Sequence, residues 1–343
     1  MTQLRERAAD DGRPVPVDGD AIEVREGIVE VPGALELHHG GRLEGVRIAW
    51  RLAGVNRGPV VAALGGISAH RCVFSSGANR GWWDALVGPG RALDSGGFRI
   101  LGFDFLGGSG ESSSPASERP FPTVSTYDQA EALLRLLNHL GITSLRAIVG
   151  ASYGGMVALA FAERFADRVN RLLVIGAADR THPMATAWRS VQRRLLQFAV
   201  RHGEGTEGVA LARALAMATY RSPEEFAARF RAPPRRVDGG FVFPVEDYLF
   251  ARGANYAARY RPESFACLSE SIDLHAVAAD RIRVPTTLVA VHEDQLVPVG
   301  DVRALCARLE QYGRLVEISS IFGHDAFLKE AVQLGPVFRS VLE

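Results

Sequence analysis

The segment Gly150-Ala151-Ser152-Tyr153-Gly154 places a serine between two glycines. An apolar run precedes it and a helical pattern follows it, which is the context of a nucleophile elbow between a strand and a helix. In such a turn the hydroxyl projects at the carboxyl edge of a sheet, above a helix N-terminus that favours developing negative charge. The alternative is a plain helix start capped by Ser152. We predict that Ser152 is a nucleophile.

A serine hydroxyl needs a general base, and the base needs an acid to orient it. In hydrolase-type chains the order is Ser, then Asp or Glu, then His. His324 lies in the loop FGHDAF after the last apolar run, where the base is expected. The preceding run ends in VHEDQ, so we predict Asp294 as the acid, with Glu293 as the alternative. Asp273 is a third acid, but no predicted strand precedes it.

An oxyanion formed at Ser152 needs two backbone N–H donors. One comes from the residue after the nucleophile, Tyr153, and the other from the loop after an earlier strand. The segment AALGGIS, residues 62–68, fits the second position because its glycines let backbone approach a substrate closely. We therefore predict Leu64 and Tyr153 as the oxyanion hole.

The apolar patterning predicts a scaffold that brings these loops together. Continuous apolar runs indicate buried parallel strands within residues 59–68, 98–112, 145–155, 171–178, 285–295 and 315–325. Helical patterns at 126–141, 156–169 and 300–313 alternate with these runs. Short alternating segments between residues 22 and 50 indicate antiparallel strands. We predict an α/β fold with a mostly parallel, doubly wound sheet.

One region interrupts the alternation of strands and helices. Residues 180–275 carry helical patterns without a clear parallel strand, which predicts a helical lid inserted into the sheet domain. The core would then consist of residues 1–179 and 276–343. We expect a loose polar arm over the first ~20 residues and a loop at 111–122, ESSSPASERPFP.

Composition excludes several classes of function. The 343 residues carry 39 basic and 39 acidic side chains, so no basic excess points to nucleic acid or to an anionic membrane surface.

The three cysteines, Cys72, Cys267 and Cys306, are widely separated in the sequence. Their spacing argues against a disulfide framework and against a structural zinc site. The charged residues 1–13 lack the apolar core of a signal peptide, and no apolar stretch would span a bilayer. We expect a cytoplasmic protein.

Several longer segments are more specific than the Gly-x-Ser-x-Gly pattern. They include GWWDALVGPGRALD (81–94), LGGSGESS (106–113), VGASYGGMVALAFAERFADRV (149–169), LARALAMATYRSPEEFAARF (211–230), EDQLVPVGDVRALCARL (293–309) and FGHDAFLKE (322–330). In these segments the chain resembles the MetX-type homoserine O-acyltransferases of the α/β-hydrolase superfamily. The resemblance covers nearly the whole chain.

The resemblance implies a ping-pong acyl transfer in methionine biosynthesis. Ser152 would take the acyl group from acyl-CoA, and L-homoserine would then accept it with His324 as general base. Acyl-CoA would be a co-substrate, and no cofactor would be needed. By the family pattern Arg213, Tyr220 and Asp325 would bind the carboxylate and ammonium groups of homoserine. A homodimer through the lid is also implied.

The chain departs from the family pattern near the acyl pocket. The loop Ala63–Gly66 replaces a common Ala-Leu-Thr-Gly sequence, and Tyr153 replaces a common Met. His70 and Arg71 follow this loop, and such side chains could pair with a succinyl carboxylate. We therefore favour succinyl over acetyl, with Arg71 as the ligand.

Two alternatives concern the group that accepts the acyl chain. L-Serine differs from homoserine by one methylene, a difference that pockets discriminate weakly. An esterase or thioesterase would use water with the same triad, and Arg213 and Asp325 would not need to converge on Ser152. A binding protein on this fold is expected to lack a triad member, whereas all three are present in this sequence.

Overall fold

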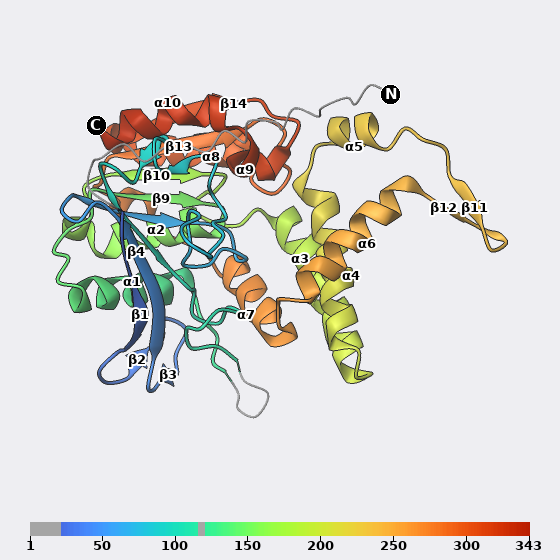
Figure 1. The fold of residues 1–343 in the computed structure, drawn as a ribbon, viewed down its shortest axis with the longest axis horizontal. Coiled ribbons are helices and arrows are strands. Elements are labelled where there is room, and N and C mark those ends of the chain that lie inside the picture. The colour runs from blue at the N-terminus through green and yellow to red at the C-terminus, as the bar shows by residue number, and fades with distance from the viewer. Residues whose placement is uncertain (1–21, 116–120) are drawn as a thin grey trace, which may run out of the picture.

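An eight-stranded sheet organises the described part of the chain, residues 22–115 and 121–343 of a computed structural model (Figure 1). Its strand order is β1-β4-β8-β5-β9-β10-β13-β14. Only the pairs β1–β4 and β4–β8 in this sheet are antiparallel. The predicted mostly parallel α/β fold is confirmed. The expected N-terminal arm and the middle of the 111–122 loop lie outside the described residues.

The main elements alternate along the chain as the patterning predicted. The sheet strands are β1 (Glu23–Glu30), β4 (Arg47–Gly54), β5 (Val60–Leu64), β8 (Arg99–Phe103), β9 (Ala147–Ala151), β10 (Leu172–Ile175), β13 (Thr286–Val291) and β14 (Gly313–Ile318). Short pairs join β2 (Leu35–Glu36) to β3 (Arg42–Leu43) and β6 (Val87–Gly88) to β7 (Leu93–Asp94). The helices of this unit are α1 (Thr126–His139), α2 (Tyr153–Arg164), α8 (Val299–Arg308), α9 (Ala326–Lys329) and α10 (Ala331–Leu342).

Side chains of the central strands alternate between two apolar cores. In β5, Ala62 and Leu64 belong to the core that includes α1, α2 and α8, whereas Val61 and Ala63 belong to the core that includes α10. All residues of β5 and β9 are buried, as expected for parallel strands covered on both faces. β14 differs because it is the last strand of the sheet, and most of its residues are partly or fully exposed.

A largely helical insertion separates β10 from β13. It consists of α3 (Pro183–Arg201), α4 (Gly205–Tyr220), α5 (Pro223–Arg229), a hairpin of β11 (Arg235–Val237) and β12 (Gly240–Val242), α6 (Pro244–Ala257) and α7 (Pro262–Asp273). Figure 1 shows α3, α4, α6 and the hairpin projecting to one side of the sheet. The sequence pattern did not predict the hairpin. No helix in the described ranges is long and apolar enough to cross a membrane.

The tight turn from β9 into α2 explains the glycines around Ser152. Ser152 has a φ of 53°, in the left-handed region that non-glycine residues rarely adopt. A Cβ atom at Gly150 would lie 2.3 Å from the carbonyl oxygen of Gly154. A Cβ atom at Gly154 would lie 2.3 Å from the carbonyl oxygen of Leu64. Only glycine fits both positions without moving backbone.

We expect Gly154→Ala to lower the free energy of unfolding by about 1–3 kcal/mol, because the new methyl group overlaps backbone atoms that cannot move cheaply. Gly300→Ala is the control, because a Cβ atom there has open space within helix α8. That control should leave stability unchanged or raise it by up to about 1 kcal/mol. Thermal and urea unfolding measure both variants, and wild-type stability of Gly154→Ala would contradict the prediction.

Candidate active site

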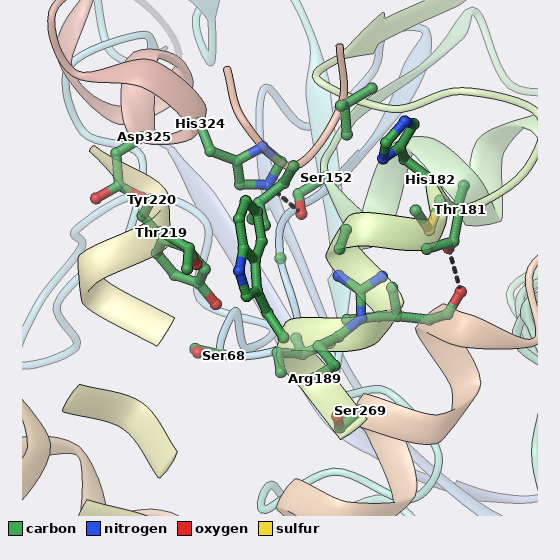
Figure 2. Close-up of a pocket in the computed structure, with 18 of the residues that line it drawn as sticks. Ser68, Ser152, Thr181, His182, Arg189, Thr219, Tyr220, Ser269, His324 and Asp325 are labelled. Atoms are coloured by element: carbon green, nitrogen blue, oxygen red, sulfur yellow. Dashed lines mark hydrogen bonds between the residues drawn. The ribbon is translucent and has the colours of Figure 1, made fainter. Parts of the chain in front are cut away.

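Three side chains from loops after β9, β13 and β14 form one hydrogen-bonded chain. Ser152 Oγ lies 2.8 Å from His324 Nε2, and His324 Nδ1 lies 2.7 Å from Asp294 Oδ2. The other carboxylate oxygen of Asp294 accepts the N–H groups of Leu296 and Val297, at 2.8 and 3.0 Å. Figure 2 shows the link between Ser152 and His324 at the edge of the cavity. The arrangement has the geometry of a nucleophile, a base and an orienting acid.

The alternative assignments for these positions do not fit the geometry. Ser152 is the N-cap residue of α2, but its side chain makes no capping hydrogen bond. Glu293 accepts the backbone N–H of Ser320 at 2.7 Å instead of contacting His324. Asp273 pairs with arginines of helix α3. The sequence order Ser, Asp, His therefore predicted the set of residues that the fold brings together.

The environment of His324 shifts its proton affinity upward. Burial is the largest single influence and lowers the pKa of this imidazole, but the nearby carboxylates, led by the charge and hydrogen bond of Asp294, together outweigh it. Asp325 adds to the increase and Arg189 opposes it, and the net pKa lies above the ordinary value of 6.5. In its predicted role as general base, His324 becomes available only as the pH rises through this increased pKa.

The predicted oxyanion residues border the nucleophile. Tyr153 is the first residue of α2, and its N–H has no backbone acceptor in the described ranges. Its side chain points away from the cavity, with the hydroxyl 2.7 Å from Ser271 Oγ. Leu64 is the last residue of β5 and does not line the cavity, whereas Gly66 does. A Cβ atom at Gly66 would lie 3.9 Å from Ser152 Oγ, so this loop backbone faces the nucleophile. The oxyanion role of Leu64 and Tyr153 stays a prediction.

A cavity in front of Ser152 lies between the sheet edge and the insertion. The core contributes Gly66, Trp82, Ser152, His324 and Asp325 to its wall, among others. The insertion contributes polar and charged side chains, which include Arg189, Gln192, Arg213, Tyr220 and Ser269. Figure 2 shows several of these residues around the Ser152 hydroxyl.

Arg213 presents a cation to this cavity. Its guanidinium lies between two aromatic rings, 4.9 Å from the centre of Tyr220 and 4.7 Å from that of Tyr256. Its Nη1 donates to the Tyr220 hydroxyl at 3.2 Å. In the described ranges Arg213 forms no ion pair with a carboxylate within the structure. The guanidinium of Arg213 is therefore available to pair with an anionic ligand in the cavity.

Asp325 presents a carboxylate to the same cavity. Its Oδ2 accepts from Nε of Arg221 at 2.9 Å, and Arg221 also contacts Glu225 at 3.2 Å. A second arginine, Arg229, lies 3.5 Å from Glu225. The other oxygen of Asp325 has no hydrogen bond within the described part of the chain. The placement of Asp325 agrees with the sequence analysis, and its binding role stays a prediction.

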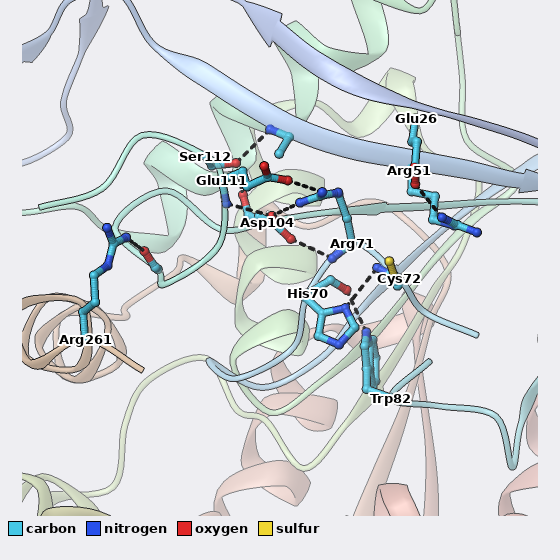
Figure 3. A network of polar contacts seen from close by, with 12 residues as sticks. Glu26, Arg51, His70, Arg71, Cys72, Trp82, Asp104, Glu111, Ser112 and Arg261 are labelled. Atoms are coloured by element: carbon cyan, nitrogen blue, oxygen red, sulfur yellow. Dashed lines mark hydrogen bonds and ion pairs between the residues drawn. The ribbon is translucent and has the colours of Figure 1, made fainter. Parts of the chain in front are cut away.

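Arg71 does not lie where the sequence analysis expected it. Its Nη1 lies 2.6 Å from Asp104 Oδ2, its backbone N–H donates to the same carboxylate, and its Nη2 pairs with Glu111 (Figure 3). Neighbouring His70 accepts the backbone N–H of Cys72. Neither His70 nor Arg71 lines the cavity. The predicted role of Arg71 as a ligand of the acyl group is therefore wrong, because its guanidinium lies outside the cavity and two carboxylates neutralise it.

The fold, with Ser152, His324 and Asp294 hydrogen-bonded at its sheet edge, is that of the α/β-hydrolase class of enzymes. The family model for the alpha/beta hydrolase fold matches residues 75–331. The chain is 42% identical to homoserine O-succinyltransferase of Xanthomonas campestris pv. campestris over 98% of this chain and 86% of that protein. It therefore belongs to the homoserine O-acyltransferase family within the α/β-hydrolase fold.

Other relatives differ in acyl group and in acceptor. Homoserine O-acetyltransferase of Thermus thermophilus is 36% identical over 76% of this chain and 72% of that protein. Serine O-succinyltransferase of Litchfieldella anticariensis is 32% identical over 92% of this chain and 97% of that protein. The crystal structure of homoserine O-acetyltransferase from Bacillus anthracis superposes with a TM-score of 0.83 at 16% identity, covering 94% of this chain and 98% of that one. That structure supports the fold.

We expect Asp294→Asn to lower kcat/KM by roughly 10³–10⁴-fold, because the imidazole loses the group that fixes its tautomer. In the wild type, kcat/KM should rise with pH to a midpoint above 6.5, since protonated His324 cannot act as a base. The variant loses the carboxylate that raises this pKa, so its midpoint should move to lower pH.

Glu293→Gln is the matched control for the acid. It changes the neighbouring carboxylate, which contacts Ser320 and not His324. We expect its pH midpoint and rate to stay close to those of the wild type. Full activity of Asp294→Asn, together with loss of activity in Glu293→Gln, would reverse the assignment.

Proposed function

We propose that the protein transfers an acyl group from acyl-CoA to the hydroxyl of L-homoserine. The main support for this proposal is that one cavity is lined by the hydrogen-bonded pair Ser152 and His324, by the cation of Arg213 and by the carboxylate of Asp325. An amino acid is a zwitterion, and one cation and one anion placed apart are the groups that fix its orientation. A simple ester hydrolase has no need for this pair.

In the first half-reaction, Ser152 Oγ attacks the thioester carbonyl while His324 Nε2 takes the hydroxyl proton. The carbon–sulfur bond then breaks, and the thiolate of CoA takes the proton from His324. Backbone N–H groups near Leu64 and Tyr153 stabilise the negative charge on the carbonyl oxygen. The product is an acyl ester on Ser152.

In the second half-reaction, the homoserine hydroxyl attacks this ester and gives its proton to His324. The bond to Ser152 breaks, and the proton returns to Ser152 Oγ. Arg213 holds the carboxylate of the amino acid and Asp325 its ammonium group, so the hydroxyl reaches the ester ahead of water. Serine is the second candidate acceptor, which the serine O-succinyltransferase relative favours.

Release of CoA tests this proposal directly. The assay follows free thiol from succinyl-CoA and from acetyl-CoA, each with L-homoserine, with L-serine or with water alone. We expect release that depends on an amino-acid alcohol, and mass spectrometry of the O-acyl amino acid identifies the acceptor. Equal release with water alone would make the protein a thioesterase and overturn the proposal.

We expect Arg213→Met to raise the KM for homoserine by roughly 10–100-fold, since a hydrogen bond to a charged group contributes about 1.5–3 kcal/mol. The KM for acyl-CoA should change little. Arg252→Met is the control, because this insertion arginine packs over Tyr248 and does not line the cavity. Steady-state kinetics with each substrate varied in turn measures both variants. An unchanged homoserine KM in Arg213→Met would remove Arg213 from the acceptor site.

We also propose that the protein forms a homodimer through the insertion. Val191, Leu195 and Phe198 on α3 are exposed at a spacing that places them on one helix face. Exposed Phe241 and Phe250 belong to the same insertion. A row of exposed apolar side chains on one helix face, as on α3, is typical of an interface.

We expect the double variant Leu195→Glu/Phe198→Glu to be monomeric, because two charges would be buried without partners in the interface. Val332→Glu is the control, since Val332 is 87% exposed on α10, outside the insertion. Light scattering after size-exclusion chromatography measures the mass. A monomeric wild type would contradict the proposed dimer, and a dimeric double variant would place the interface elsewhere.

A further inference from the structure

The loop that follows β5, residues 65–70, borders the nucleophile Ser152. Four consecutive residues of this loop line the cavity: Gly66, Ile67, Ser68 and Ala69. The N–H groups of Gly66 and Ile67 have no backbone acceptor in the part of the chain that the structure describes. Such N–H groups beside a serine nucleophile are suited to stabilise a negatively charged oxygen, provided that the loop is held in place.

The sheet domain holds the two ends of this loop. The N–H of Gly154 in α2 donates to the carbonyl oxygen of Gly65 at 2.9 Å. Trp82 Nε1 donates to the carbonyl oxygen of His70 at 2.9 Å (Figure 3). Neither hydrogen bond reaches Ile67 in the middle of the loop, so its position depends on another contact.

A tyrosine of the insertion contacts the middle of the loop. The Tyr260 hydroxyl donates to the carbonyl oxygen of Ile67 at 2.7 Å. Tyr260 is buried between α6 and α7 and does not line the cavity. Burial raises the pKa of this phenol well above its ordinary value, so the hydroxyl stays protonated near neutral pH. Tyr260 therefore supports the loop without touching a ligand in the cavity.

Neighbouring contacts fix the position of Tyr260. Its ring stacks on that of Tyr256, with the ring centres 4.7 Å apart. The next residue, Arg261, donates through its backbone N–H to Ser109 Oγ at 2.9 Å and through Nη2 to Ser114 Oγ at 2.6 Å. These hydrogen bonds tie this segment of the insertion to a loop of the sheet domain. The phenol is thus presented to the loop after β5 from a fixed position.

We propose that Tyr260 is a positioning residue that holds the loop after β5 in the conformation that stabilises an oxyanion at Ser152. This inference rests on the nucleophilic role of Ser152 in the proposed acyl transfer. The carbonyl of Ile67 and the N–H of Ser68 belong to one planar peptide unit, so a hydrogen bond to the carbonyl also fixes the direction of that N–H. The insertion thereby contributes to the rate of acylation itself.

The test measures the rate at which 4-nitrophenyl acetate acylates Ser152, together with kcat and KM for acyl transfer. Tyr260→Phe keeps the aromatic ring and removes only the hydrogen-bond donor. We expect roughly tenfold slower acylation, which is less than the roughly 10²–10³-fold loss for an oxyanion donor itself, because Tyr260 acts through the loop. The KM for homoserine should change by less than about twofold, since the lost support matters in the transition state.

Tyr248→Phe is the matched control for the removal of a buried hydroxyl. Tyr248 is buried on α6 of the same insertion and does not line the cavity. Its hydroxyl has no hydrogen-bond partner in the described part of the chain. We expect this variant to be acylated at the wild-type rate.

Inhibition by methylboronic acid gives a readout that a merely structural role would not change. Its tetrahedral adduct with Ser152 resembles the transition state and places an oxygen where the oxyanion forms. Tyr260→Phe should therefore weaken this inhibition by about the same factor as it slows acylation, whereas Tyr248→Phe should leave it unchanged.

Three results would overturn the inference. They are an unchanged acylation rate in Tyr260→Phe, slower acylation with unchanged inhibition by the boronic acid, and a raised KM for homoserine without slower acylation. Acylation precedes the entry of the acceptor, so it is measured independently of homoserine. A protein that transfers the acyl group only to water would therefore refute acyl transfer to homoserine while still reporting whether Tyr260 holds the loop.

Discussion

The backbone conformation of Ser152 is the constraint on which the site depends. A positive φ at a residue with a side chain costs about 1–3 kcal/mol, so the surrounding structure must hold it. The N–H of Ser152 donates to Ile175 in β10, and its carbonyl accepts from Gly155 in α2. Gly150 and Gly154 leave the space that the turn requires. The parallel order β9-β10-β13-β14 then brings the loops of Asp294 and His324 to the same sheet edge.

The two parts of the molecule contribute different chemistry. The sheet domain supplies Ser152, His324 and Asp294, whose hydrogen bonds need no residue from the insertion. The insertion supplies Arg189 on α3 and Arg213 on α4, which face the cavity from the other side. Under the proposed mechanism, a change in the insertion alters contacts with the substrate without altering the hydrogen bonds among Ser152, His324 and Asp294.

Sequence patterns predicted the features that short-range physics determines. Apolar runs mark buried strands, and the residues directly after them must lie at one sheet edge, so Ser152, Asp294 and His324 could be placed together before their distances were known. The exposure of β14 and the β11–β12 hairpin could not be predicted in this way. The exposure of β14 depends on its place as the last strand of the sheet, which the order of elements along the chain does not give. The hairpin depends on a pairing of only three residues per strand within a region of helical patterns.

The arginines show where prediction from sequence stops. Arg71 follows the predicted oxyanion loop, so its position along the chain suggested contact with the acyl group. Its guanidinium instead forms an ion pair with Asp104, the residue directly after β8. Arg189 sits in a long amphipathic helix, where an arginine is usually solvent-exposed. Its burial depends on an ion pair with Asp273, 84 residues away in the chain. The same carboxylate also accepts a hydrogen bond from Arg193. The pairing of two arginines with one carboxylate is thus a property of the packed insertion, which no local motif encodes.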